Sequence, residues 1–145
     1  LIVGQGDFQY KVDKAWGNLD PTHQPVHHCH EMVLDSRKRL ICSTVAKDFN
    51  VLDYNKDGKL LQSSQLNLTE PHGLITSGEG KAQTFWITDS ADGRVLNLDL
   101  NGRIIRELKV PKDQIPAGKA FKPTETAIAS NGDIYVADGY GTNLI

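Results

Sequence analysis

The stretch "HGLITSGEGKAQTFWITD", residues 72–89, decides the fold because its pattern occurs three times. The other two copies are "HEMVLDSRKRLICST" at residues 30–44 and "TETAIASNGDIYVAD" at residues 124–138. From first to last residue there are 14 positions in the outer copies and 17 in the middle one. The extra residues of the middle copy fall in its central turn, where an insertion costs little. The sequence therefore predicts three copies of one β-hairpin.

Further strands are predicted after each hairpin. The segments "FNVLDYNKDGKLLQS" (49–63) and "GRVLNLDLNGRIIREL" (93–108) each read as a strand, an Asp-Gly or Asn-Gly turn and a strand. After the third hairpin, "TNLI" (142–145) begins the same third strand. Short runs of β-branched, leucine and aromatic residues are plentiful, and a convincing helical stripe is absent. We expect an all-β chain, with no helix longer than about two turns in residues 30–62, 72–108 and 124–145.

A four-stranded unit that repeats every 40 to 50 residues is typical of a blade of a β-propeller. One blade cannot bury both of its faces, so successive blades stack on each other. The predicted organisation is one propeller domain, in which residues 1–27 are the end of a preceding blade and a linker, 28–66 and 67–110 are blades, and 111–145 are a linker and an incomplete blade. We expect the remaining blades to come from the rest of the chain or from another chain.

The charges exclude one class of partner. The sequence has 145 residues, and Lys+Arg 16 against Asp+Glu 18 gives a net charge of -2. These charges are interspersed and form no basic stripe, so we expect no nucleic-acid binding. No apolar run approaches the roughly 20 residues that a membrane-spanning helix needs, and we expect no membrane span in this segment.

Cys29 and Cys42 do not predict a disulfide framework. In a hairpin of residues 30–35 and 39–45, Cys29 pairs nearer position 45 than position 42. That offset corresponds to about 10 Å along a strand, which is beyond the reach of a disulfide. We expect free thiols.

Two histidines and a threonine occupy the same position in the three copies. His30, His72 and Thr124 each begin the innermost strand of a blade, which lines the central channel. Imidazoles brought together in this way can bind Zn²⁺ or a similar ion, and the alternative is that each ring caps a loop or hydrogen-bonds within the channel. Strand alternation in "VHHCH" (26–30) lets at most two of its four polar side chains face one ion. His72 and His30 are therefore the candidate metal ligands, and His23 in the expected linker is not.

The neighbours of these positions have predicted structural roles. We expect Pro71 to fix the approach of the chain to His72 and Gly73 to leave room beside the ring. Asp89 and Asp138 end the second strands, where the first copy has Thr44, and should accept hydrogen bonds from loop or neighbouring-blade amides. A further set, predicted to pack between blades, comprises Ile41, Trp86 and Tyr135.

Three motifs resemble those of the NHL-repeat six-bladed propellers. They are "PHGL" (71–74), "FWITD" (85–89) and "FKPTETAIASNGDIYVADGYGTN" (121–143). Over roughly residues 28–145 the chain is most similar to the catalytic core of peptidyl-α-hydroxyglycine α-amidating lyase and its bacterial lyase-like relatives. The resemblance implies a secreted or periplasmic location.

The same resemblance implies roles for individual residues. His72 corresponds to one of three zinc-binding histidines, and the other two are implied in later blades. The backbone carbonyl of Leu74 corresponds to a ligand of a structural calcium, with Met32 at the equivalent point of the preceding blade. Tyr140 corresponds to a catalytic tyrosine near the zinc.

One departure from the family concerns a cation. The lyase has an arginine at the position of Val45, and the nearest cation here is Lys47. A lysine cannot reproduce the bidentate clamp of a guanidinium on a carboxylate. Lys47 is still a candidate catalytic residue, and so is Glu125, beside the start of the third inner strand, where a metal would give it a catalytic or ligand-orienting role.

The sequence thus favours a zinc-dependent lyase-like or hydrolase-like propeller acting on a small-molecule or peptide substrate at the channel mouth. One alternative is a non-catalytic NHL module that binds a protein or a glycan. Another is a calcium-dependent lactonase-type hydrolase, which would need acidic and asparagine ligands in the channel. Histidine, histidine and threonine at the strand starts favour zinc over the lactonase.

Overall fold

The computed structural model describes residues 1–17, 26–110 and 112–145. The second and third repeat copies fold into neighbouring sheets. The larger is antiparallel in the order β10-β9-β8-β7, and the smaller pairs β11 with β12. The strands are β7 (Pro71–Ser77), β8 (Thr84–Asp89), β9 (Arg94–Leu98), β10 (Ile104–Leu108), β11 (Glu125–Ile128) and β12 (Ile134–Ala137).

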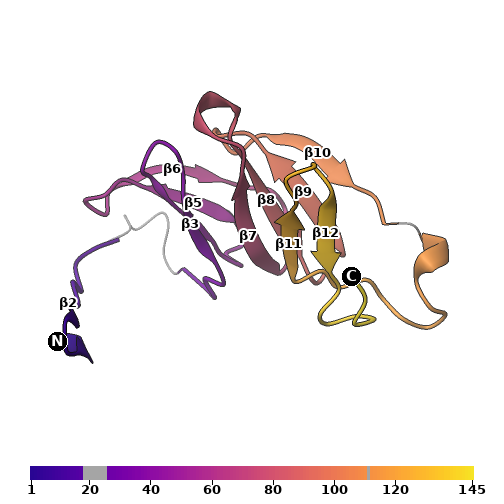
Figure 1. Ribbon diagram of the computed structural model, residues 1–145, viewed down its shortest axis with the longest axis horizontal. Coiled ribbons are helices and arrows are strands. Elements are labelled where there is room, and N and C mark those ends of the chain that lie inside the picture. Colours follow the sequence, from indigo (N-terminus) through magenta and orange to yellow (C-terminus); the bar gives the residue numbers. More distant parts are fainter. Residues whose placement is uncertain (18–25, 111) are drawn as a thin grey trace.

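The first copy folds into a four-stranded antiparallel sheet of the same kind, in the order β3-β4-β5-β6. Its strands are β3 (Met32–Leu34), β4 (Leu40–Ser43), β5 (Val51–Tyr54) and β6 (Leu60–Ser64). A separate hairpin of β1 (Ile2–Gln5) and β2 (Phe8–Lys11) lies apart from the three sheets (Figure 1). The expected four-stranded repeat is confirmed. The blade boundaries at residues 28–66, 67–110 and 111–145, and the assignment of 1–27 to a preceding blade, stay predictions.

Helical structure is almost absent from the described residues, as the sequence predicts. It consists there of two 3₁₀ turns, η2 (Gly80–Ala82) and η3 (Lys112–Gln114). No helix in the described part of the chain is long and apolar enough to cross a membrane. His23 of the expected linker lies outside the described residues.

The three sheets stand side by side with their first strands adjacent (Figure 1). Strand β7 contacts both β3 and β11, so the start of the second inner strand lies between the starts of the other two. This places positions 30, 72 and 124 at neighbouring sites, which is the geometry that the repeat predicts.

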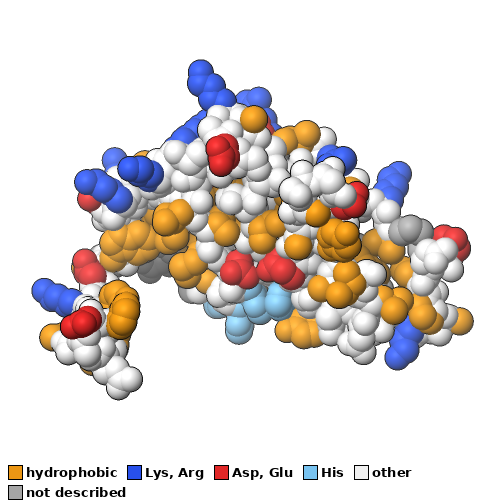
Figure 2. Space-filling view, viewed as in Figure 1, with side chains coloured by type: hydrophobic (Ala, Val, Ile, Leu, Met, Phe, Trp, Pro, Cys, Tyr) orange, Lys and Arg blue, Asp and Glu red, His pale blue; other side chains and the backbone are white. Residues whose placement is uncertain are grey.

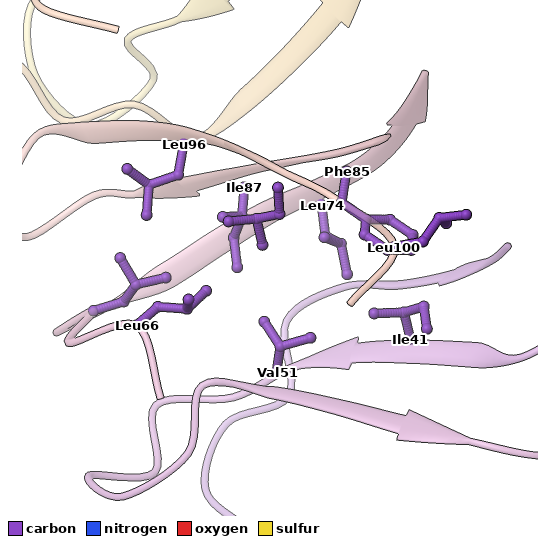
Figure 3. Close-up of a cluster of buried hydrophobic side chains, with 10 residues drawn as sticks. Ile41, Val51, Leu66, Leu74, Phe85, Ile87, Leu96 and Leu100 are labelled. Atoms are coloured by element: carbon purple, nitrogen blue, oxygen red, sulfur yellow. The ribbon is translucent and has the colours of Figure 1, made fainter. Parts of the chain in front are cut away.

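The main core fills the space between the first two sheets (Figure 3). Alternation along β4 points Ile41 into this core and Leu40 toward the other face of the sheet, where it packs against a second cluster with Leu52 and Tyr54. Ile41 is fully buried, which confirms its packing between blades. Trp86 is buried beneath the guanidinium of Arg106, 5.1 Å from the ring centre, whereas Tyr135 is 51% exposed and shows no such packing. The core residues are Ile41, Val51, Leu66, Leu68, Leu74, Phe85, Ile87, Leu96, Leu98 and Leu100.

Polar groups also join the first sheet to the second. Arg39 forms ion pairs with Asp35 and Asp53, and its Nη2 donates to the carbonyl of Leu100, just after β9, at 2.8 Å. Burial raises the pKa of Asp53 to about 6, against the opposing charge of Arg39. A buried ion pair adds little net stability, because removing its charges from water costs about as much as their attraction returns.

Asn50 holds the segment between the two four-stranded sheets. Its Oδ1 accepts from the amides of Leu66 at 3.0 Å and Leu68 at 3.1 Å. Its Nδ2 donates to the carbonyl of Leu68 at 3.1 Å. Asn50 is fully buried, so water cannot reach the polar groups around it, and these hydrogen bonds satisfy them instead.

The residues that end the second strands anchor the chain entering each sheet, as predicted. Asp89 accepts from the amides of Thr69 at 2.8 Å and Glu70 at 3.0 Å. Asp138 accepts from the amides of Lys122 at 2.6 Å and Thr142 at 2.7 Å. In the first sheet the pattern is inverted, because the hydroxyl of Thr44 donates to the carbonyl of His27 at 2.7 Å.

The chain entering the first sheet departs from regular pairing. The amide of Ser43 donates to the carbonyl of Glu31, and the amide of Val45 donates to the carbonyl of His27. Between these two bonds the entering segment, 27–31, is two residues longer than the facing segment, 43–45. His28 has a φ of 44°, which permits the bulge. Both thiols are free, as expected.

Candidate functional site

His72 projects from a break in the pairing of β7 with β8. Pro71 pairs with Asp89 and Leu74 with Ile87, so His72 and Gly73 bulge between them. The amide of Gly73 donates to the hydroxyl of Thr88 at 2.8 Å and is thereby satisfied away from the ladder. A bulge of this kind redirects a side chain from the face of the sheet.

Two hydrogen bonds orient the ring of His72. Nδ1 lies 3.0 Å from the carbonyl oxygen of Thr124, and Nε2 lies 3.1 Å from the hydroxyl of Tyr140. A carbonyl can only accept, so the neutral ring carries its proton on Nδ1 and donates to Thr124. Nε2 then accepts from the hydroxyl of Tyr140.

The ring of His30 stacks on that of His72, with centroids 4.6 Å apart and planes at 28°. Tyr140 approaches His72 from another side, edge-on at 5.2 Å and 82°. The rings of His30 and His72 therefore converge, as their shared phase predicts. Thr124 joins them through its backbone carbonyl, since its hydroxyl donates to the carbonyl of Ala137 instead. Figure 2 shows histidine side chains gathered at one margin of the molecule with acidic side chains beside them.

A pair of carboxyl groups lies next to the histidines. Burial raises the pKa of Glu125, and the charge and hydrogen bond of Glu31 raise it further. The amide of Thr126, at 2.8 Å, and the nearby His72 oppose that shift. Glu125 therefore retains a proton to higher pH than an ordinary glutamate.

Glu31 was not among the residues predicted from the sequence, although a signal for it exists. Glu31, Gly73 and Glu125 each follow the aligned position that begins an inner strand. A Cβ on Gly73 would lie 2.6 Å from Oε1 of Glu125 and 2.6 Å from the carbonyl oxygen of Thr124. The glycine makes room for its counterpart in the next sheet, and the expected room beside the imidazole stays a prediction.

The other predicted site residues lie elsewhere. Lys47 is exposed between β4 and β5, its carbonyl accepts from Gln65 at 3.4 Å, and no described contact joins it to the histidines. Met32 begins β3 and Leu74 lies buried in β7, on neighbouring inner strands. Among the described residues there is no group of three or more side chains that could hold a metal ion.

A cavity of about 450 Å³ opens beside His30. Val45 forms part of its wall, so the position at which the resemblance to the lyase implies an arginine provides no cation here. Glu70 also contributes, with its Oε2 accepting from the hydroxyl of Ser90 at 2.8 Å. The full lining is His28, His30, Val45, Thr69, Glu70 and Ala91.

The chain is similar in sequence to two kinds of known protein, although no protein-family model matches it. It is 34% identical over 78 residues to a Caenorhabditis elegans protein named "Probable peptidyl-alpha-hydroxyglycine alpha-amidating lyase pgal-1", which covers 52% of this chain and 21% of that one. It is 28% identical over 141 residues to NHL repeat-containing protein 3 of Mus musculus, covering 91% of this chain and 40% of that one. The chain thus spans less than half the length of these relatives.

Two solved structures share the fold. A Bacteroides caccae protein of unknown function matches with a TM-score of 0.58 and 18% identity, over 74% of this chain and 37% of that one. An inactive variant of virginiamycin B lyase from Staphylococcus aureus, crystallised with quinupristin, matches with a TM-score of 0.55 and 16% identity, over 88% and 37%.

The repeated sheets and these structural neighbours define the chain as a segment of a β-propeller. The sequence relatives confirm its resemblance to NHL-repeat propellers and to the amidating lyase.

Proposed function

We propose that this propeller segment supplies a zinc ligand, His72, and a proton-transfer residue, Tyr140, to a lyase-like enzyme that acts on a small-molecule or peptide substrate. The observation that carries the proposal is the orientation of His72. A backbone carbonyl holds its Nδ1, and its Nε2 meets the hydroxyl of a tyrosine from the next sheet.

The donor chemistry of His72 fits zinc. A zinc-ligating histidine usually donates its other ring N–H to a carbonyl or carboxylate, as Nδ1 does here to Thr124. In that tautomer the other nitrogen, Nε2, carries no proton, and an unprotonated imidazole nitrogen is the atom that binds a metal ion. His30, stacked on His72, is a second candidate ligand. A complete site needs further ligands, which we propose lie in blades beyond this segment.

The remaining polar groups suit proton transfer. Bound zinc would polarise a substrate oxygen as a Lewis acid. Tyr140 is 61% exposed and its hydroxyl can give a proton to a substrate or take one from it. Glu125 lies close to His72 and retains its proton to higher pH than an ordinary glutamate, because burial raises its pKa. Lys47 stays a candidate without a described contact to these groups.

A structural calcium belongs to the same proposal. Its suggested ligands are the backbone carbonyls of Leu74 and Met32. The strands that carry them, β7 and β3, lie next to each other. Oxygen donors from adjacent strands are the ligand type that Ca²⁺ prefers.

The proposal is tested by comparing His72→Ala with His27→Ala in the intact protein. We expect His72→Ala to lose bound zinc, measured by mass spectrometry of the metal content, and to lose cleavage of a peptidyl-α-hydroxyglycine, the substrate named for the nematode relative. His27→Ala should change neither, since its side chain is exposed and its described bonds come from the backbone carbonyl. Unchanged zinc in His72→Ala would contradict the ligand assignment.

A non-catalytic NHL module that binds a protein or glycan is the second candidate. It is favoured by the extent of one similarity, because NHL repeat-containing protein 3 matches 91% of this chain and the lyase matches 52%. Val45 also favours this candidate, because it provides no cation at the position where the resemblance to the lyase implies an arginine. A wild-type protein that contains no zinc and cleaves no α-hydroxyglycine peptide would support this candidate over the enzyme.

A further inference from the structure

The segment between β6 and β7 contains the tripeptide Asn-Leu-Thr at residues 67–69, which is an acceptor sequence for N-linked glycans. An acceptor sequence has a serine or threonine two residues after the asparagine, with any residue except proline between them. Of the eight asparagines in the sequence, only Asn67 meets this condition. The others are followed at that distance by aspartate, leucine, arginine or isoleucine.

The local backbone turns the side chain of Asn67 to solvent. Leu66 and Leu68, on either side of it, are each 6% exposed and belong to the main core. Their amides both donate to Oδ1 of Asn50, which fixes the two leucines in place. Between them Asn67 has a φ of 52°, a left-handed conformation that asparagine adopts more readily than most residues, and its side chain is exposed.

The side-chain amide of Asn67 is available for modification. Among the described residues no hydrogen bond involves this amide, whereas the backbone carbonyl of Asn67 accepts from Nη1 of Arg94 at 3.3 Å. Arg94 is itself held by Glu107, whose Oε1 lies 3.1 Å from its Nε. The backbone is therefore fixed while the amide is free, and a glycan on Asn67 would displace no packed side chain.

We propose that Asn67 carries an N-linked glycan and that the protein is secreted through the endoplasmic reticulum, where this modification is made. An acceptor asparagine on an exposed loop is the position that such a glycan requires. The two named sequence relatives are animal proteins, and animal cells carry out this reaction. The inference concerns only this segment and holds whether or not the channel mouth binds zinc.

The sugar donor is an oligosaccharide linked to a lipid pyrophosphate. Nδ2 of Asn67 forms a bond to the anomeric carbon of the first sugar, and the bond from that carbon to the pyrophosphate oxygen breaks. The lipid pyrophosphate leaves, the amide loses one proton, and nothing is oxidised or reduced. The transferase acts on the chain before it folds, when the hydroxyl of Thr69 is not yet bonded to Oδ2 of Asp92, at 2.6 Å in the folded protein.

The glycan would stand close to the candidate site without entering it. Thr69 and Glu70 line the cavity beside His30, and Asn67, two residues before Thr69, does not. Two residues of extended chain span about 7 Å, so the attachment point lies just outside the rim of the cavity. We therefore expect the cavity to stay open to a small molecule.

The test is to produce the full-length protein in cultured animal cells and to map its peptides by mass spectrometry. We expect the protein in the medium, with a glycan on the peptide that contains Asn67. Treatment with peptide N-glycosidase in water enriched in heavy oxygen should remove the glycan and leave an aspartate labelled with heavy oxygen at residue 67. A secreted protein with an unmodified residue 67, or a protein retained in the cytosol, would overturn the proposal.

Three variants separate the acceptor from its surroundings. Thr69→Ala should abolish the glycan because it destroys the acceptor sequence. Asn67→Gly should also abolish it and should still fold, since glycine adopts the left-handed conformation freely. Asn143→Gly is the matched control, because Asn143 is also exposed, has a φ of 61° and is not in an acceptor sequence. Its glycan at Asn67 should be unchanged, and a heavy-oxygen label that persists at residue 67 in Thr69→Ala would contradict the assignment.

Discussion

Nε2 of His72 lies 3.1 Å from the hydroxyl of Tyr140, although 68 residues separate them in the chain. The histidine begins the inner strand of the second sheet, and the tyrosine follows the second strand of the third. Since Nδ1 already donates to Thr124, the hydroxyl donates to Nε2. The contact therefore positions the nitrogen that we propose as a metal ligand and the hydroxyl that we propose as a proton carrier.

Tyr140→Phe should separate chemistry from folding. The ring and its edge contact remain, so the free energy of unfolding should change by no more than about 0.5 kcal/mol, as for other exposed positions. Loss of a proton-transfer group should lower kcat about 100-fold or more, with a smaller effect on KM. Tyr135→Phe, at a similarly exposed tyrosine, should change neither quantity. An unaltered kcat in Tyr140→Phe would assign the hydroxyl a packing role.

Gly73→Ala should disturb the junction between the second and third sheets. The added methyl would lie 2.6 Å from both Oε1 of Glu125 and the carbonyl oxygen of Thr124, and the backbone atom cannot easily move away. We expect a loss of about 1–3 kcal/mol in the free energy of unfolding, measured by urea denaturation. Adding Glu125→Ala should recover part of that loss, since it removes one of the two collisions. Equal stability of Gly73→Ala and wild type would contradict the described packing.

The repeat was sufficient to predict both the sheets and the convergence of the His30 and His72 rings beside the backbone of Thr124. Residues at the same phase of stacked blades must occupy neighbouring positions, whatever their identity. The contact of Glu31 with Glu125 follows the same rule one residue later, and it was missed because Gly73 interrupts the acidic pattern at that phase.

Other features depend on local backbone geometry that the repeat does not encode. The bulge before β3 is one of them, since it depends on the φ of 44° at His28 and on the backbone bonds of His27 and Glu31 to the residues that end β4 and follow it. The orientation of His72 depends on a backbone carbonyl, which is present at every residue and leaves no sequence signal. Lys47 was chosen for its charge and proximity along the chain, and the structure shows it exposed with no described contact to the histidines.

Asn50→Ala should weaken the link between the two four-stranded sheets. Its side chain satisfies the amides of Leu66 and Leu68, which would be left buried without partners. We expect the free energy of unfolding to fall by at least about 2 kcal/mol, because each unsatisfied buried group costs about 1–3 kcal/mol. Gln65→Ala is a suitable comparison, since that residue is exposed and makes one long bond of 3.4 Å. A small effect at Asn50 would show that water replaces the lost bonds.

Glu125→Gln should change how stability depends on pH. Burial and the neighbouring Glu31 raise the pKa of Glu125 in the folded protein. The folded state therefore binds this proton more tightly than the unfolded state, and this group's contribution to stability is lost as pH rises from about 4.3, the ordinary pKa of glutamate, through the raised value. Glutamine stays neutral and can still donate to Glu31. The variant should match the wild type near pH 4 and melt at a higher temperature near pH 8.

Glu107→Gln should change the dependence of stability on pH in the opposite direction, and it serves as the comparison for Glu125→Gln. The hydrogen bond from Arg94 lowers the pKa of Glu107, so the stability that this pair contributes is present above the ordinary pKa and is lost as pH falls through the lowered value. This variant should melt at or slightly below the wild-type temperature near pH 8, since the pair is at the surface. Melting curves of the three proteins across this range measure both differences. If Glu125→Gln melts below the wild type near pH 8, the carboxyl is charged and stabilising in the folded protein, and its proposed role as a held proton beside His72 is wrong.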